Sequence, residues 1–449
     1  MKSNDFAHTN MIKLVISLAI PSMVAQLVNV LYSIVDRMFV GQIPVVGNLS
    51  LAAVGVCGPI VTLLSSFGTL IGIGGSIWMS IRLGQKQEKK ASEILYNSFI
   101  MLVGISVVLT ILFLLLKPHL IVWFGGSPAL FDLANTYLTI YTLGTFFALM
   151  AIGLNYFITC QGYATVAMFT VCIGAVTNII LDYLFIKHFH MGIAGAAIAT
   201  VIAQILSCLF ALGFLRFKSA IRLQKEEIQI ESMKYIVHLG FSPFVILASD
   251  SIILIVMNAV LQKFGGAQGD ILISAVTVAQ SYFLLITGPL IGITSGTQPI
   301  IAYNFGAKDK KRIQSAFKTI LVMAFSFCLI MFIISLLYSD VFVSWFTQDP
   351  TTMPIANKAI KVFCLGILFM SVQYVLVDGI TALSNVKLSL VMSLNRKMLY
   401  LVSTCLLPIF FGVSNTFFAQ PIADIVSSIV TTTCFLKIIP NYLRSKGIV

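Results

Sequence analysis

Long apolar runs recur along the whole chain, and they restrict its fold more than any other feature of the sequence. Most runs reach about 20 residues or more, the length that a helix needs to cross a bilayer, and they lack the alternation of barrel strands. In lipid, only helices and closed barrels satisfy the hydrogen-bonding groups of the backbone. Charged residues make up 10% of the chain and hydrophobic residues 58%, which leaves too little polar surface for a water-soluble globule. The sequence therefore predicts an all-α polytopic membrane protein.

Polar segments, glycines and prolines divide the chain into twelve predicted transmembrane helices. The first six cover residues 12–40, 52–80, 93–116, 131–157, 164–186 and 192–216. The second six cover residues 234–261, 271–303, 312–338, 354–382, 387–411 and 415–437.

Basic residues distinguish the two sides of the membrane. If both termini are cytoplasmic, the cytoplasmic loops and tails hold most of the 28 Lys and Arg, and the opposite loops hold only Lys117, Lys187 and Lys263. By the positive-inside rule we predict a multi-pass protein of the cell membrane with both termini in the cytoplasm. The same asymmetry explains the net charge of +12 without a nucleic-acid partner. The eight cysteines stand singly, as small hydrophobes do, so we expect no cysteine metal site.

The second half of the chain repeats the first at a constant offset. The shift that places Gly84 on Gly306 also places Trp123 on Trp345, with a phenylalanine after each tryptophan. Because the chain has only three tryptophans, this coincidence is a strong sign of an internal repeat. Each repeat holds six spans, an even number, so both halves enter the membrane from the same side.

The repeat predicts two parallel six-helix bundles, residues 1–216 and 234–449, joined by a charged cytoplasmic linker at 217–233. In transporters built from parallel repeats, the substrate site lies between the halves, and rocking of the halves gives alternating access. A protein that moves small molecules across a membrane is therefore the leading interpretation.

Acidic residues inside apolar spans cost about 2.5–3.5 kcal/mol each at the bilayer centre, so each needs a reason. Asp36 lies near the outer end of the first span and Asp182 near that of the fifth, with Asn178 on the same helix face one turn away. Thr200 lies about 12 Å below the outer surface, from the rise of a helix. These depths predict that the four side chains converge in the first half. Their hard oxygens suit a proton or Na⁺, and we expect no other metal and no cofactor.

Other polar residues inside the spans are candidates for the wall of a substrate cavity. They are Gln26, Asn29, Tyr32, Asn155, Gln204, Asp250, Asn258, Gln280 and Asp424. For Asp250 and Asp424 a place on the cavity wall and a purely structural place remain equally open. Arg396, about ten residues into its span, either lines the inner cavity or extends to the interface. Asp378, near a cytoplasmic helix end, is expected to be solvated.

Several segments resemble the multidrug and toxic compound extrusion (MATE) family, over nearly the whole chain. They are QLVNVLYSIVD at 26–36, GIGGS at 72–76, GAVTNIILD at 174–182, GAAIATVIAQ at 195–204 and QPIIAYNFGAK at 298–308. The resemblance implies a V-shaped 6+6 fold. It also implies export of small-molecule drugs or toxic organic cations, amphipathic and chemically varied, in exchange for H⁺ or Na⁺.

The sequence looks most like the bacterial branch with its cation site in the N-terminal lobe. Carried over by position, that site is the same group of four, from Asp36 to Thr200. Two departures stand out. Residues 159–162 read TCQG where relatives commonly have Arg-Ala-x-Gly, so a positive charge is missing. Asp250 resembles the carboxylate of the other bacterial branch, which leaves the coupling ion open between H⁺ and Na⁺. We expect a monomer.

Three alternatives compete with a drug antiporter. A flippase of lipid-linked sugars from the same superfamily usually has extra helices or a strongly cationic cavity, and intramembrane acids argue against it. A channel or receptor remains possible in principle, although the chain has no TVGYG filter. An ATPase is disfavoured because the chain has no GxxxxGK[ST] loop, and we do not expect an enzyme.

Overall fold

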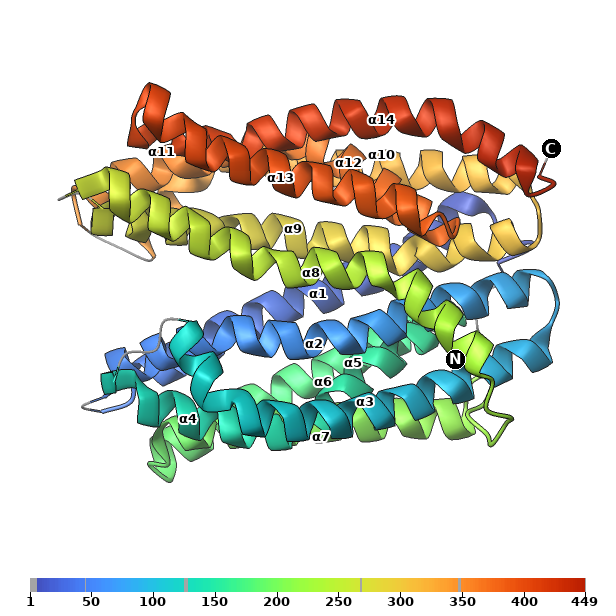
Figure 1. Ribbon diagram of the computed structural model, residues 1–449, viewed down its shortest axis with the longest axis horizontal. Coiled ribbons are helices and arrows are strands. Elements are labelled where there is room, and N and C mark those ends of the chain that lie inside the picture. The colour runs from blue at the N-terminus through green and yellow to red at the C-terminus, as the bar shows by residue number, and fades with distance from the viewer. Residues whose placement is uncertain (1–5, 45, 125–127, 267–268, 346–348, 449) are drawn as a thin grey trace.

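The computed structural model describes residues 6–44, 46–124, 128–266, 269–345 and 349–448. Within these residues the chain forms helices joined by short loops, with no strand (Figure 1). The prediction of an all-α fold is therefore confirmed. Large apolar side chains such as Leu115 and Phe410 are exposed on the outer surface, as expected of a protein whose solvent is lipid.

Two groups of helices lie one above the other in Figure 1. The lower group, which we call the N-lobe, contains α1 (Met11–Gly41), α2 (Gly47–Gly84), α3 (Glu88–Trp123), α4 (Pro128–Leu143), α5 (Thr145–Cys160), α6 (Ala164–Asp182), a π-helical turn (Tyr183–His188) and α7 (Gly192–Phe217).

The upper group, which we call the C-lobe, contains α8 (Ile230–Gly265), α9 (Gly269–Gly306), α10 (Lys310–Ser344), α11 (Thr352–Cys364), α12 (Ile367–Ala382), α13 (Val386–Phe411), a 3-10 helix (Val413–Phe418) and α14 (Ala419–Ser445).

Nine of the described helices are long and apolar enough to cross a membrane, and two bent pairs bring the number to eleven. The twelfth expected span is α8. It has 36 residues, which at 1.5 Å per residue is longer than the roughly 30 Å of a hydrocarbon core. Its role as a span remains a prediction.

Two predicted spans, 131–157 and 354–382, are each broken into two helices. α4 and α5 meet at 56°, and α11 and α12 meet at 47°. A glycine lies at each break because a neighbouring helix approaches closely. A Cβ on Gly144 would lie 2.6 Å from Val201 of α7, and a Cβ on Gly366 would lie 2.8 Å from Pro421 of α14. The offset between the two glycines is that of the internal repeat, so the break belongs to the repeat.

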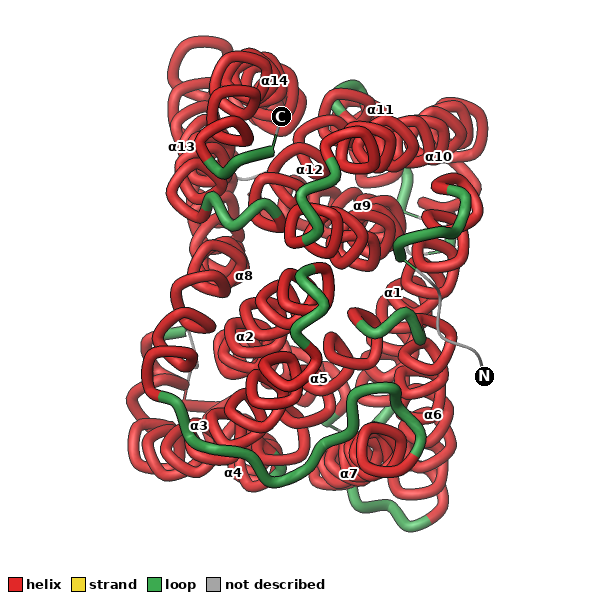
Figure 2. Tube along the Cα trace, turned by 90° about the vertical axis from the view of Figure 1, so that its right-hand side faces the viewer, coloured by secondary structure: helices red, strands yellow, loops and turns green. Residues whose placement is uncertain are grey.

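The two lobes meet through α1, α2, α8 and α9 (Figures 1 and 2). α1 packs along α9, and α2 packs against both α8 and α9. These contacts are closest towards the end of the molecule that carries both termini, which we call the terminal face. There the C-terminal ends of α2 and α9, Gly84 and Gly306, cross with their backbones in contact.

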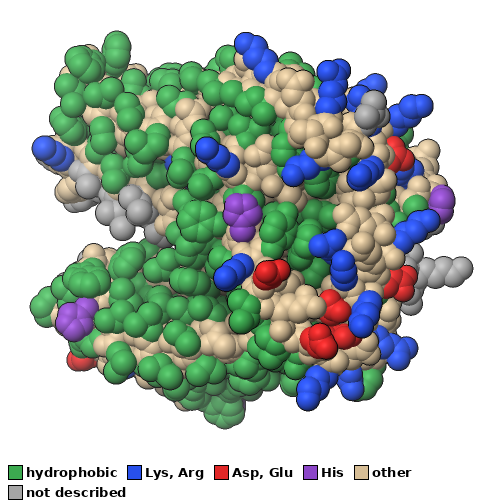
Figure 3. All heavy atoms as spheres, turned by 45° about the vertical axis from the view of Figure 1, so that its right-hand side comes forward, with side chains coloured by type: hydrophobic (Ala, Val, Ile, Leu, Met, Phe, Trp, Pro, Cys, Tyr) green, Lys and Arg blue, Asp and Glu red, His purple; other side chains and the backbone are tan. Residues whose placement is uncertain are grey.

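At the opposite end the lobes separate, and the space-filling view is hollowed between them (Figure 3). The same view shows Lys and Arg gathered at the terminal face, where acidic residues are interspersed. This distribution agrees with the predicted orientation. That the terminal face is cytoplasmic remains a prediction from the positive-inside rule.

The segment between α7 and α8 is fastened to the N-lobe through two buried amide side chains. Asn97 of α3 donates to the Glu227 carbonyl oxygen at 2.9 Å and accepts from the Gln229 N–H at 2.8 Å. A second buried amide, Gln161, accepts from the Ile221 N–H at 2.7 Å. The TCQG segment therefore binds the linker through an uncharged side chain.

We expect Asn97→Ala to lower the free energy of unfolding by about 1–3 kcal/mol, because it leaves buried backbone groups of the linker without partners. Thermal unfolding of the detergent-solubilised protein measures this change. Gln224→Ala is the matched control, since Gln224 is an exposed amide in the same linker. Equal melting temperatures for the two variants would show that the linker is not held through Asn97.

Candidate functional site

Two carboxyl groups face each other inside the N-lobe. Asp182 ends α6 and is fully buried, and Asp36, in the last third of α1, is 9% exposed. Their carboxyl groups lie within hydrogen-bonding reach of each other. Two ionised carboxylates have no donor to share, and neither Asp182 oxygen nor Asp36 Oδ1 meets a donor among the described residues. A proton shared between the oxygens, or a cation bound by both groups, would satisfy such a pair.

An amide and a hydroxyl extend this pair. Asn178 Nδ2 donates to Thr200 Oγ1 at 3.3 Å, and the Thr200 hydroxyl donates to the Ala196 carbonyl oxygen at 3.0 Å. Asn178 Oδ1 remains buried without a donor in the described structure. The oxygens of this group that have no donor among the described residues are thus Asp36 Oδ1, both oxygens of Asp182 and Asn178 Oδ1. Such a set of hard oxygens can take H⁺ or a hard cation.

The local sequence of α6 explains how the group is assembled. Asn178 and Asp182 are four residues apart, so they lie on the same face of the helix. Directly after Asp182 the chain widens into the π-helical turn Tyr183–His188. π-helical turns are rare and often occur at functional sites. No feature of the sequence indicated this turn.

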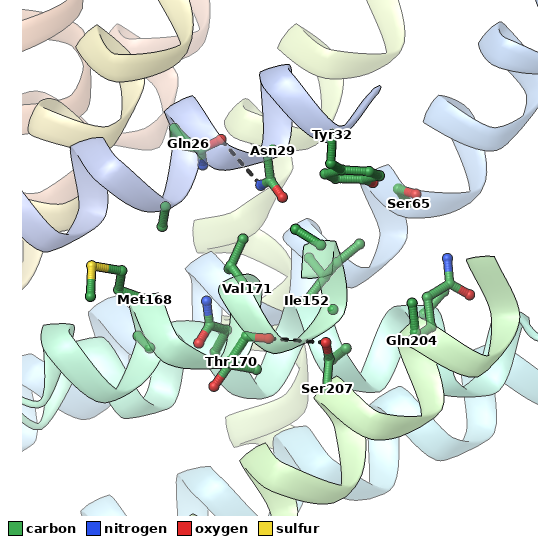
Figure 4. A pocket seen from close by; sticks show the side chains of 18 of the residues that line it. Gln26, Asn29, Tyr32, Ser65, Ile152, Met168, Thr170, Val171, Gln204 and Ser207 are labelled. Carbon is green, nitrogen blue, oxygen red and sulfur yellow. Dashed lines mark hydrogen bonds between the residues drawn. The ribbon is translucent and has the colours of Figure 1, made fainter. Parts of the chain in front are cut away.

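Beside the group lies a cavity of about 320 Å³. It is lined by side chains of α1, α2, α4, α5, α6, α7 and α9 (Figure 4). In Figure 4, Gln26, Asn29 and Tyr32 of α1 face Thr170 and Val171 of α6 across the cavity.

The structure brings together the predicted polar residues of the N-lobe on this cavity wall. Those residues are Gln26, Asn29, Tyr32, Asn155 and Gln204. Asn178 and Thr200 line the same wall, so the oxygens that surround the two carboxyl groups also border the cavity. Asn178 and Thr200 therefore belong both to the predicted group of four and to the cavity wall.

Of the other predicted cavity residues, Asp250, Gln280 and Asp424 are not among the described residues that line this cavity. Asp424 is fully buried in the C-lobe, and its carboxylate is bound by Arg396 and Gln420. The carboxylate of Asp250 pairs with Lys397. Gln280 is half-buried in α9, and the side chain of Asn258 lies outside the described part of α8. The interpretation of Asp424 as a cavity residue differs from the structure, because sequence depth could not show that Arg396 covers it.

Asp378 also differs from its expected place in solvent. Its carboxyl group is half-buried and lies close to Thr294 and Gln298 of α9. Depth alone placed Asp378 near the helix end, but the close packing of α9 and α12 covers it there.

Sequence reasoning missed the tyrosines that surround the site. The rings of Tyr137 and Tyr141 in α4 stack with centroids 6.3 Å apart, and the Tyr141 hydroxyl accepts from Gln204 Nε2 at 3.2 Å. Tyr156 of α5 lines the cavity as well. Their spacings in two helices that are bent against each other carry no signal that the sequence alone could give.

Comparison with known proteins supports the resemblance. The family model MatE matches residues 21–184 and 247–406, once in each half of the chain. The multidrug export protein MepA of Staphylococcus saprophyticus is 24% identical over 442 residues, covering 94% of this chain and 93% of that protein. The MepA protein of Staphylococcus haemolyticus is 22% identical, covering 94% and 92%.

Solved structures show the same fold. A MATE protein in complex with MaL6 has a TM-score of 0.92 and 20% identity, covering 100% of both chains. An outward-facing multidrug resistance MATE family transporter of the MOP superfamily has a TM-score of 0.91 and 21% identity, also over 100% of both chains. The two matches to the family model cover most of the chain, in the two halves that the internal repeat defines. The chain belongs to the MatE family of multidrug and toxic compound extrusion proteins.

Proposed function

We propose that this protein is a secondary antiporter that exports amphipathic, often cationic small molecules across the cell membrane in exchange for H⁺ or Na⁺. The observation that carries the proposal is the buried carboxyl pair, Asp36 and Asp182, beside a cavity that shares Asn178 and Thr200 with it. The names of the MepA relatives, multidrug export proteins, agree with this substrate class.

The chemistry of the cavity supports a cationic or neutral substrate. Its described lining has amides, hydroxyls and tyrosines but neither Lys nor Arg. A flippase of lipid-linked sugars needs a cationic cavity for the phosphates of its substrate, so this lining argues against that alternative. A positive substrate is attracted by the field of the neighbouring carboxyl groups.

Coupling requires that the two arrangements of the lobes, each open to one side of the membrane, differ in their affinity for the ion. The carboxyl pair binds the ion in one arrangement more tightly than in the other, so loading the pair shifts the population of arrangements. A cationic substrate in the cavity and a cation at Asp36 and Asp182 repel each other, because Asn178 and Thr200 belong to both sites. Binding of one therefore favours release of the other, which is the requirement for exchange.

A channel is disfavoured by the packing at the terminal face. There α2 contacts α9 through backbone atoms at Gly84 and Gly306. A channel needs a continuous path, whereas a carrier needs one end closed while the other is open.

The test is uptake of rhodamine 123, a fluorescent organic cation, into everted membrane vesicles that contain the protein. We expect uptake when the lumen is more acidic or richer in Na⁺ than the medium, because either ion would leave as the dye enters. Vesicles without the protein are the control, and nigericin or monensin should abolish uptake by collapsing the pH or Na⁺ gradient. Uptake that follows neither gradient, or that needs ATP, would overturn the proposal.

A further inference from the structure

Four charged side chains meet inside the C-lobe, outside the cavity described above. Arg396 of α13 donates through Nε to Asp424 Oδ1 of α14 at 2.7 Å. The next residue, Lys397, pairs with Asp250 of α8. We call these four residues the charge quartet. Its helices are neighbours, since α13 packs between α8 and α14 (Figure 1).

Within the quartet, both carboxylate oxygens of Asp424 have hydrogen-bond donors, whereas the guanidinium of Arg396 has donors without acceptors. Asp424 is fully buried, and its second oxygen accepts from Gln420 Nε2 at 2.9 Å. Only Nε of Arg396 donates to Asp424. Its two terminal amino groups meet no acceptor among the described residues, although its side chain is only 13% exposed. A guanidinium has five N–H donors in a fixed plane, so four of them are left without an acceptor among the described residues, while its carbon lies 5.3 Å from the centroid of the Tyr374 ring.

Asp250 forms the exposed rim of the quartet. Its side chain is 52% exposed, whereas that of its partner Lys397 is 11% exposed. One carboxylate oxygen accepts from Lys397, and the other has no partner among the described residues. The lobe thus holds two complementary groups, a guanidinium with open amino groups on α13 and an open carboxylate oxygen on the neighbouring helix α8.

Stability does not explain the quartet. Buried ion pairs contribute little more than well-packed apolar residues of the same volume, because desolvation offsets the attraction. A charged cluster that stabilises little inside an apolar lobe is better explained by a ligand. A guanidinium with open terminal amino groups matches a carboxylate, which it binds through two parallel hydrogen bonds.

We propose that the charge quartet is a second substrate subsite, at which Arg396 binds the carboxylate of a zwitterionic amphiphile and Asp250 faces its cationic group. A zwitterion adds no net charge to the four charges already present, whereas a simple anion would leave the lobe negative and cost desolvation energy. The inference rests on the proposed export function and names a substrate class for it.

Two dyes that differ in one group test the subsite. Rhodamine 110 carries a free carboxylate, and rhodamine 123 is its methyl ester with the same cationic ring system. Fluorescence anisotropy of each dye with the purified protein in detergent gives two dissociation constants. In Arg396→Lys we expect the ratio of the constants, rhodamine 110 over rhodamine 123, to rise about tenfold, because lysine keeps the charge beside Asp424 but loses the planar fork.

A double variant, Arg396→Gln with Asp424→Asn, removes both charges together and leaves no unpaired buried ion. It should raise the ratio at least as much as Arg396→Lys and protects the test against misfolding of one variant. Lys358→Gln is the matched control, because it removes an exposed positive charge from the same lobe and should leave the ratio unchanged.

The inference is overturned if wild-type protein does not bind rhodamine 110, or if the ratio stays constant in both Arg396 variants. Failure of the proposed function would look different. Rhodamine 123 uptake into vesicles would then ignore the ion gradients, whatever the dyes do in the binding measurement.

Discussion

Asp36→Asn is expected to lower gradient-driven uptake of rhodamine 123 by about 10- to 100-fold, with the protein still folded in the membrane. The substitution keeps the size of the side chain but removes its charge and its ability to carry a proton. A hydrogen bond or contact to a charged group is worth about 1.5–3 kcal/mol, and about 1.4 kcal/mol is a factor of ten. The remaining carboxyl group, Asp182, then has no second acid with which to hold the ion.

The same variant should melt at the same temperature as the wild type or at a higher one. Neither oxygen of Asp182 nor Oδ1 of Asp36 has a donor among the described residues, and an isolated buried carboxylate is costly. Loss of export with retained or increased stability separates a functional role from a structural one. Asp132→Asn makes the same chemical change at an exposed position of the N-lobe and should leave uptake unaltered. Full uptake by Asp36→Asn would exclude the carboxyl pair from coupling.

The position of this pair could be predicted because two simple quantities determine it. Hydropathy gives the ends of each span, and the rise per residue then gives the depth of a side chain. The sequence predicts that Asp36, Asn178, Asp182 and Thr200 converge in the outer half of the first bundle. The structure places the carboxyl group of Asp36 beside that of Asp182 and the amide of Asn178 beside the Thr200 hydroxyl. Depth is enough for this group because α1, α6 and α7 are neighbours within one small bundle.

Depth was not enough in the C-lobe. Whether Asp424 lines a cavity or pairs with Arg396 depends on how α13 and α14 are rotated about their axes, and hydropathy does not give that rotation. The only signal was the pair of basic residues, Arg396 and Lys397, in the middle of an apolar span. Charges there need partners, so two acids elsewhere in the lobe could have been assigned to them. Which acid pairs with which base still depends on packing.

The helix breaks show a related limit. Gly144 and Gly366 are equivalent positions of the repeat, and each breaks a span against the last helix of its half. Single glycines occur in many unbroken helices of this chain, so neither residue predicts a bend by itself. The sequence shows only that two glycines occupy equivalent positions of the repeat. It does not show that Val201 and Pro421 lie against them, and this close approach is what explains the breaks.

Gly84→Ala is expected to open the terminal face. A Cβ on Gly84 would lie 1.9 Å from the Tyr303 carbonyl oxygen, and a Cβ on Gly306 would lie 2.1 Å from that of Ile81. The two contacts are repeat equivalents, because the shift that places Gly84 on Gly306 also places Ile81 on Tyr303. The internal repeat therefore places a pseudo-two-fold axis between the ends of α2 and α9. One added methyl group must push two backbones apart at that axis.

The clash disappears when these helix ends separate, so it destabilises only the arrangement in which the terminal face is closed. Overpacking costs about 1–3 kcal/mol, so the balance of the two arrangements should shift by about 5- to 150-fold towards an open terminal face. Labelling of Ser295→Cys, a position on the cavity wall, with an impermeant maleimide measures the shift by mass spectrometry. In everted vesicles, which expose the face predicted to be cytoplasmic, labelling should accelerate by that factor, and in right-side-out vesicles it should slow.

Opposite changes on the two sides are the decisive feature, because general loosening of the protein would accelerate labelling from both. Gly58→Ala provides the comparison within α2, since no atom lies within 4 Å of a Cβ at that position, and it should alter neither rate. If Gly84→Ala left both rates unchanged, the backbone crossing would not be what holds the terminal face closed. Exchange by rocking lobes would then need a different contact to separate, because a carrier must break its seal on one side before it can release an ion there.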